Sequence, residues 1–170
     1  LVESDARPSM APFRLFPHPR GALQNLKPEA VDILSLAEGD VVIDVKAVGI
    51  NFRDVLNVLG MYPGDPGPPG GDCSGVVVSC GSGVTSLRPG DAVFGLAGGS
   101  LGSHVQVAAP RMAAMPPNLS FESAATCPTV FITVDTAFRQ AAGCRPGERV
   151  LVHGAAGAVG LAAIQQAAAL

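Results

Sequence analysis

The sequence has no tryptophan, one tyrosine and only 15% charged residues. Its 11 lysine and arginine residues are outnumbered by 14 acidic residues, giving a net charge of −3, and they do not cluster. Because nucleic-acid-binding domains carry a basic excess, this balance argues against a nucleic-acid partner. No apolar run approaches the roughly 20 residues that a membrane-crossing helix needs, which argues against a membrane protein.

Cysteine is scarce as well. The four cysteines include no C-x-x-C pair and lack the density of a disulfide scaffold; they are Cys73, Cys80, Cys127 and Cys144. We interpret them as reduced, mostly buried thiols. The polar, proline-containing segment 1–12 is unlike a secretory signal and is interpreted as a linker. We therefore expect the protein in the cytoplasm or in an organelle interior.

Glycine (21) and proline (15) are abundant, which favours short strands joined by turns. Segments rich in β-branched residues, partly alternating, separate loop-forming sequences; they lie at 41–48, 75–80, 92–95 and 103–108. Between the first two, Asn51 can cap a short helix, and residues 60–71 form a loop. Short, regularly spaced strands predict a mostly β, partly open barrel over residues 13–126.

The periodicity changes after Pro117. A short helical stretch at 119–126 precedes Pro128, which stands where a first-turn proline opens a helix that Gly143 closes. An apolar strand at 150–153, a glycine-rich turn and an Ala-rich helix at 161–170 follow. This order predicts the first β-α unit of an α/β Rossmann domain over residues 127–170, incomplete within these residues.

The glycine-rich turn has the spacing G-x-x-G-x-x-G and comprises Gly154, Ala155, Ala156, Gly157, Ala158, Val159 and Gly160. Between a strand and a helix, such a turn lets the backbone approach the pyrophosphate of a dinucleotide, which the helix N-terminus attracts. An ordinary tight β-α turn is the alternative. The residue that distinguishes NADH from NADPH follows about 20 positions later, so that choice stays open.

Several further motifs occur in one order along the chain. They are GINFRDVL (49–56), GMYPG (60–64), GDCSGVV (71–77) and PGDAVFG (89–95). Together with the glycine turn they resemble the medium-chain dehydrogenase/reductase superfamily. Within it, NFRDVL followed by GMYPG is similar to the enoyl reductase domains of polyketide and fatty acid synthases. The resemblance implies a GroES-like barrel followed by a Rossmann domain, with the active site between them.

The implied activity is NAD(P)H-dependent reduction of a trans-2-enoyl chain held as a thioester. The implied partners are an acyl carrier protein domain with its phosphopantetheine arm, neighbouring synthase domains and, as an option, a second copy of the chain. A zinc-independent quinone or enal reductase remains an alternative, as does a barrel module without catalytic activity. The incomplete cofactor domain leads us to expect that these residues alone are inactive.

Zinc is not expected as a cofactor. Zinc-using relatives place a cysteine where this sequence has Asn51, and a His-Glu pair where it has Asp72 and Cys73. Asparagine is a poor zinc ligand, and the other two residues do not complete the three protein ligands of a catalytic site. The predicted cofactor is therefore NADPH, with NADH not excluded.

Without a Lewis acid, another group must stabilise the enolate formed when hydride adds to the β-carbon. Tyr62 is the only tyrosine, and the resemblance places a functional tyrosine on this loop. Its phenol can donate a hydrogen bond or a proton; packing on the barrel rim is the alternative. The resemblance also places Asn51 and Thr133 beside the nicotinamide. The alternatives are helix capping for Asn51 and a bond to its own backbone for Thr133. We expect Arg53 and Asp54 to form an ion pair.

Overall fold

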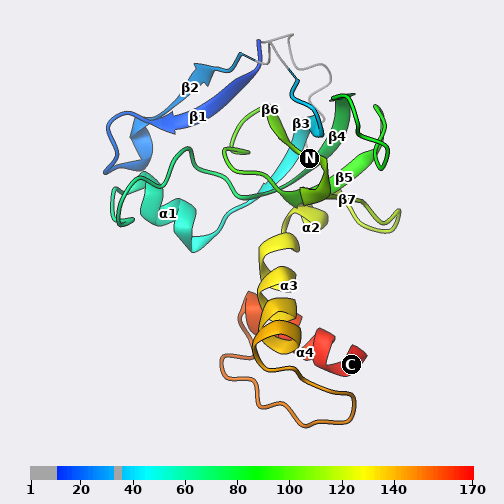
Figure 1. Cartoon of the computed structure of the whole chain (residues 1–170). Helices are drawn as coiled ribbons and strands as arrows, with labels where there is room; N and C mark the ends of the chain where they lie inside the picture. Colours follow the sequence, from blue (N-terminus) through cyan, green and yellow to red (C-terminus); the bar gives the residue numbers. More distant parts are fainter. Residues whose placement is uncertain (1–10, 33–35) are drawn as a thin grey trace.

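The computed structural model describes residues 11–32 and 36–170. It consists of a β-rich part and a helical part that follows it in the chain (Figure 1). The strands are β1 (Phe13–Pro17), β2 (Leu26–Ala30), β3 (Asp40–Gly49), β4 (Asp72–Cys80), β5 (Ala92–Leu96), β6 (His104–Ala108) and β7 (Met112–Ala114). The α-helices are α1 (Phe52–Val58), α2 (Phe121–Ala125), α3 (Pro128–Asp135) and α4 (Ala158–Ala169).

The β-rich part is built on a five-stranded antiparallel sheet in the order β6-β3-β4-β5-β7. The alternating residues of β3 send Val41, Ile43 and Val45 into one core, where Val77 and Val93 from the neighbouring strands meet them. Irregularities in the β3–β4 pairing curl the sheet around this core. The predicted mostly β, partly open barrel is confirmed, with no closed barrel among the described residues.

A separate two-stranded sheet, β1 with β2, lies beside the barrel. These strands were not predicted from the sequence; each contains a proline, Pro17 in β1 and Pro28 in β2, which weakens a strand signal. Phe16 faces Lys27 across the pair, and Arg14 faces Glu29. Cross-strand pairing rather than a buried face therefore defines them.

Helix α2 packs against the barrel and sets where the chain leaves it to begin α3. The Ser74 hydroxyl on β4 donates to the Phe121 carbonyl at 2.6 Å. Gly49 at the end of β3 lies against Ala125, and a Cβ at this position would overlap the Ala125 carbonyl oxygen. The strand end and the helix thus touch through their backbones, and the start of α3 is held close to the barrel.

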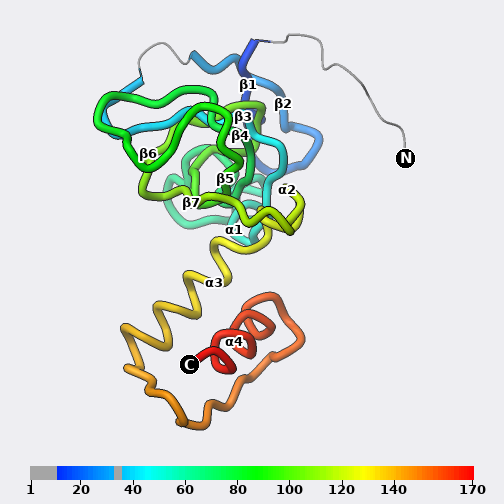
Figure 2. The backbone as a smooth tube through the Cα atoms, turned by 90° about the vertical axis from the view of Figure 1, so that its right-hand side faces the viewer, coloured from blue at the N-terminus to red at the C-terminus, as the bar shows by residue number. Residues whose placement is uncertain are grey.

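Helix α3 leads away from the barrel and continues as a π-helix at Thr136–Ala141, so the predicted helix is present from Pro128 to Ala141. Its far end packs against α4 through Val134, Ala162 and Ala163. Figure 2 shows α4 beside this helix, within the curve of the preceding segment. No helix of the described residues is long and apolar enough to cross a membrane.

The predicted strand at 150–153 is wrong as a hydrogen-bonded strand. Strands exist through pairing, and among the described residues no second strand of a parallel sheet lies beside this segment. Val152 still packs on the α3–α4 core, whereas Leu151 is 81% exposed. Helix α4 begins at Ala158, earlier than predicted, because the end of the glycine turn forms its first turn.

Candidate active site

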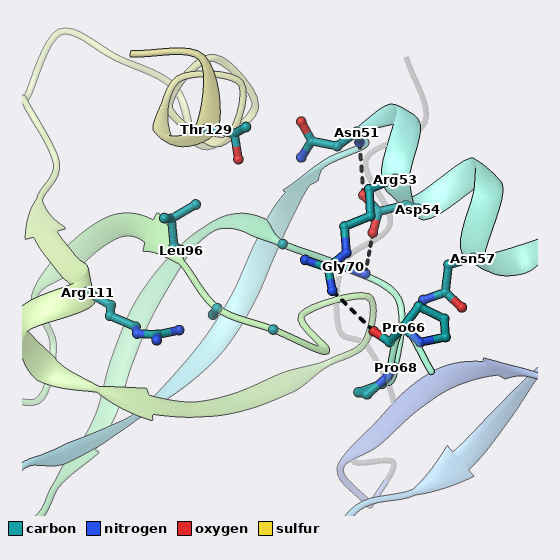
Figure 3. Close-up of a pocket in the computed structure, with 13 residues that line it drawn as sticks. Asn51, Arg53, Asp54, Asn57, Pro66, Pro68, Gly70, Leu96, Arg111 and Thr129 are labelled. Carbon is teal, nitrogen blue, oxygen red and sulfur yellow. Dashed lines mark hydrogen bonds between the residues drawn. The ribbon is translucent and has the colours of Figure 1, made fainter. Parts of the chain in front are cut away.

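A polar pocket of about 400 Å³ lies between α1, the loop that precedes β4, the segment after β5 and the start of α3 (Figure 3). We call it the polar pocket. Its walls combine charged, amide and proline side chains with exposed backbone: Asn51, Arg53, Asp54, Asn57, Pro66, Pro68, Gly70, Gly71, Leu96, Ala97, Gly98, Arg111 and Thr129.

Asp54 ties the start of α1 to the loop behind it. Its side chain is 7% exposed and accepts hydrogen bonds from the backbone N–H groups of Asn51 (2.9 Å) and Gly70 (2.8 Å). A carboxylate in the first helical turn also faces the positive end of the helix dipole. The shape of the polar pocket on this side therefore depends on one buried carboxylate.

The expected ion pair between Arg53 and Asp54 is absent. Neighbouring residues on a helix point in different directions, so the two side chains diverge. Arg53 instead donates to the Pro66 carbonyl at 3.5 Å, and its guanidinium lies 5.0 Å from the centre of the Tyr62 ring. The arginine thus links α1 to the loop that carries the tyrosine.

Arg20 and Asn57 hold the loop that precedes β4 through further hydrogen bonds. Arg20 donates to the Asn57 side-chain oxygen and to the Gly67 carbonyl, both at 3.0 Å. Asn57, 2% exposed, donates to the Gly67 carbonyl at 3.1 Å. These bonds replace the regular secondary structure that a segment rich in proline and glycine cannot form.

Asp72 joins three elements at the inner wall of the pocket. It is 2% exposed; one carboxylate oxygen accepts from the Asn51 side-chain amide at 3.1 Å. The other oxygen accepts from the Thr129 backbone N–H at 3.2 Å and from the Thr129 hydroxyl at 2.7 Å. One carboxylate on β4 thereby fixes the residue before α1 and the first turn of α3.

The structure brings only part of the predicted site into this pocket. Asn51 lines it, and its amide is oriented by Asp72. Tyr62 is half-buried but is not among the lining residues. Thr133 is exposed and also outside the lining; its hydroxyl donates to the Thr129 carbonyl at 2.7 Å.

Thr129 lines the pocket in place of Thr133, and sequence reasoning missed it. The available signal was its position next to Pro128, which places it in the first turn of α3. There its free N–H group can meet a carboxylate from the barrel. Arg111 was missed for a different reason, because it is far from every motif in the sequence.

The glycine turn has the properties that a dinucleotide diphosphate requires. Gly154 adopts a left-handed conformation with φ +65°, and a Cβ at Gly160 would overlap the Gly154 carbonyl oxygen. Gly157 precedes α4 and offers no side-chain cap. The first backbone N–H groups of α4 have no hydrogen-bond partner among the described residues, and they belong to Ala158, Val159 and Gly160. Ala158 and Val159 are exposed and Gly160 is buried; unpartnered N–H groups at a helix start suit an anionic diphosphate.

The residues at the positions of zinc ligands do not fit zinc. Cys73 is fully buried in the barrel core, and burial, aided by the Asp72 carboxylate, raises the pKa of its thiol to about 12. Zinc binds the thiolate, which this environment disfavours. Asp72 is already occupied by its hydrogen bonds to Asn51 and Thr129. Within the described ranges, no three His, Cys, Asp or Glu side chains gather as a metal site.

Barrel, linking helix and glycine turn together define a medium-chain dehydrogenase/reductase. Residues 37–166 match the family described as alcohol dehydrogenase GroES-like domain, and the chain belongs to this family. The chain is 46% identical over 160 residues to the pikromycin polyketide synthase component PikAII of Streptomyces venezuelae. That match covers 91% of this chain and 4% of the synthase component.

The fold of this chain is also similar to those of solved reductase structures. The CurK enoyl reductase aligns with a TM-score of 0.86 at 34% identity, covering 94% of this chain and 52% of CurK. The Escherichia coli quinone oxidoreductase complexed with NADPH aligns with a TM-score of 0.75 at 34% identity, covering 93% and 50%. The chain thus spans about half of these oxidoreductases and a small part of the synthase it matches.

Proposed function

We propose that this chain carries the substrate pocket and the first part of the cofactor site of an enoyl reductase in a polyketide synthase. The enzyme reduces a trans-2-enoyl thioester on the phosphopantetheine arm of an acyl carrier protein, using NADPH. The observation that carries the proposal is the polar pocket, with Asn51 and Thr129 on its wall at the foot of α3. The same helix packs against α4, which follows the glycine turn.

The chain's own residues would hold the cofactor at two places. The free N–H groups at the start of α4 bind the diphosphate, and the absent side chain at Gly160 keeps the turn tight. Asn51, oriented by Asp72, meets the nicotinamide end. Thr133 lies one turn along α3 from Thr129, and its exposed position supports the proposed nicotinamide contact. When bound, the cofactor supplies a hydride to the β-carbon of the substrate.

Tyr62 is the proposed proton or hydrogen-bond donor. Negative charge moves to the thioester oxygen as the β-carbon is reduced, and the α-carbon then takes a proton. Tyr62 is supported in this role by its contact with Arg53, which itself lines the pocket. The role requires the phenol, which lies outside the pocket lining, to turn toward the substrate by a change in side-chain rotamer.

The partners follow from the substrate. The carrier-bound chain requires an acyl carrier protein domain, and the synthase relatives, of which this chain matches 4% and 7%, support neighbouring synthase domains. A quinone oxidoreductase is the second candidate, supported by the similarity to the Escherichia coli enzyme with NADPH.

The test is substrate competition in an enzyme that contains this chain and a complete dinucleotide-binding domain. We expect NADPH oxidation with crotonyl-pantetheine and a much lower kcat/KM with 1,4-benzoquinone. The reverse preference would identify a quinone reductase. No turnover with either substrate, in a folded enzyme that binds NADPH, would indicate a barrel module without catalysis. Repeating the assay with NADH tests the cofactor choice.

A further inference from the structure

Two arginines face the polar pocket from different elements. Arg53 projects from α1, and Arg111 projects from the short turn Ala109–Arg111 that precedes β7 (Figure 3). Neither forms an ion pair with a carboxylate of the described residues. Two arginine side chains without an ion-pair partner among the described residues thus line one cavity of a chain whose net charge is negative.

The carboxylates nearest to the pocket form no ion pair with these arginines. Asp54 accepts two backbone N–H groups, and Asp72 accepts from Asn51 and Thr129. Both carboxylates are buried, and each of their oxygens already accepts a hydrogen bond. Arg53 and Arg111 are exposed and available to a ligand that enters from solvent.

Arg111 has no bracing role of the kind that Arg20 has. Arg20 bonds Asn57 and Gly67 and stacks on Phe16, so its guanidinium holds the fold together. The Arg111 side chain makes no hydrogen bond to any described residue. A guanidinium is costly to order without a partner, and such a side chain in a concave site suits a ligand.

The backbone of Arg111 is nevertheless placed by close packing. Gly95 on β5 pairs with Met112 on β7, and a Cβ at Gly95 would overlap the Arg111 carbonyl oxygen. Because Gly95 has no side chain, the backbone of Arg111 lies close against β5. Arg53 is held from its side by the Pro66 carbonyl and the Tyr62 ring.

The other residues that line the pocket restrict which part of a substrate can lie at the arginines. Asn51 and Thr129 line the same cavity of about 400 Å³, so a group bound at the arginines lies close to the nicotinamide end of the proposed site. The phosphate at the far end of a phosphopantetheine arm is too remote from the reacting carbons to fit there. The carbonyl oxygen conjugated to the double bond is adjacent to them.

We infer that Arg53 and Arg111 form an anion site for the carbonyl oxygen of an α,β-unsaturated thioester, an inference that rests on the proposed function. Hydride addition to the β-carbon breaks the carbon–carbon π bond and moves an electron pair onto this oxygen as an enolate. A proton added to the α-carbon restores the carbonyl. The positive charges of the two guanidiniums stabilise the oxygen while it is negative, and a bound thioester strengthens this interaction by displacing water.

A ligand that ionises without hydride transfer tests the anion site directly. Acetoacetyl-pantetheine forms an enolate that absorbs in the near ultraviolet, so its pKa can be followed when it is bound to the complete enzyme without NADPH. We expect the pKa of the bound ligand to fall by about one unit or more below that of the free ligand, because cations stabilise the ionised form. Arg111→Gln and Arg53→Gln should each remove much of this shift, and Arg111→Lys should keep part of it.

Arg88→Gln is the matched control, because Arg88 is an exposed arginine on a turn outside the pocket. It should leave the ligand pKa unchanged. Thermal melts that match the parent show that each variant is folded. In turnover of crotonyl-pantetheine, we expect Arg111→Gln to lower kcat about 100-fold with little change in KM.

The outcomes separate this inference from the proposed function. An unshifted ligand pKa in the parent, or the same shift in both glutamine variants as in the parent, overturns the anion site. If enoyl turnover persists in that case, the proposed function stands without it. A shifted pKa that depends on Arg111, in an enzyme that does not reduce enoyl thioesters, supports the anion site and removes the proposed function.

Discussion

Replacing Asp72 by alanine tests the central hydrogen-bond network of the site. The carboxylate is 2% exposed and accepts three hydrogen bonds, from the Asn51 amide and from the backbone and hydroxyl of Thr129. These donors come from the residue before α1 and from the first turn of α3. Their loss affects both the stability of the chain and the geometry of the polar pocket.

The expected size of the effect follows from these bonds. Hydrogen bonds to a charged group contribute about 1.5–3 kcal/mol each, but bonds that share one carboxylate are not additive. We therefore expect Asp72→Ala to lower the free energy of unfolding by about 3–5 kcal/mol. In a chain of 170 residues, about 2–4 °C of Tm corresponds to each kcal/mol, so the Tm should fall by about 6–20 °C.

Thermal and urea unfolding monitored by circular dichroism measure this loss. Asp72→Asn should be intermediate, because it keeps an oxygen for Thr129 but turns a donor toward the Asn51 amide. Glu38→Ala is the control: Glu38 is exposed and has no hydrogen bond or ion pair within the described part of the chain. An Asp72→Ala protein that melts within about 2 °C of the Glu38→Ala protein would refute the reasoning.

Four further predictions follow from the same structure. Tyr62→Phe in the complete enzyme should lower kcat by about 100- to 1000-fold and leave NADPH affinity unchanged; equal rate and equal α-carbon stereochemistry would mean that Tyr62 only packs. Gly160→Ala should weaken NADPH binding measured by calorimetry, because its Cβ collides with the Gly154 carbonyl; parental affinity would contradict the proposed diphosphate site. Burial raises the pKa of the Cys73 thiol from 9.0 to about 12, so the unfolded chain ionises it first. The free energy of unfolding should then fall as the pH rises through this window, and fall less in Cys73→Ala. Elemental analysis should find no stoichiometric zinc, and one chelator-resistant zinc per chain would overturn this expectation.

Much of the local structure could be predicted from short stretches of sequence. Alternating β-branched residues identified β3 to β6, and Pro128 marked the start of α3, because these signals act over a few residues. The glycine turn was located as well: the conformation of Gly154 and the tight approach at Gly160 both require the absence of a side chain. The linked motifs were sufficient for the family.

The arrangement of the site required the tertiary structure. Asp72 meets Asn51 and Thr129, which lie 21 and 57 positions away in the sequence. Only the curl of the sheet and the seating of α2 bring these residues together. Arg53 and Arg111 line one pocket for the same reason. Thr129 lines it in place of Thr133 because the first turn of α3 meets Asp72 on β4, and Thr133 lies one turn farther along the helix.

Local sequence signals and tertiary contacts act over different distances along the chain. Turn conformation, strand alternation and helix starts depend on neighbouring residues, so the sequence by itself determined strands β3 to β6, the start of α3 and the glycine turn of this protein. Which side chains share a pocket, and whether residues 150–153 pair as a strand, depend on elements distant in the chain. Strand pairing and the lining of a pocket are decided only when those elements pack together, because a hydrogen bond needs a donor and an acceptor and a cavity needs walls from several elements.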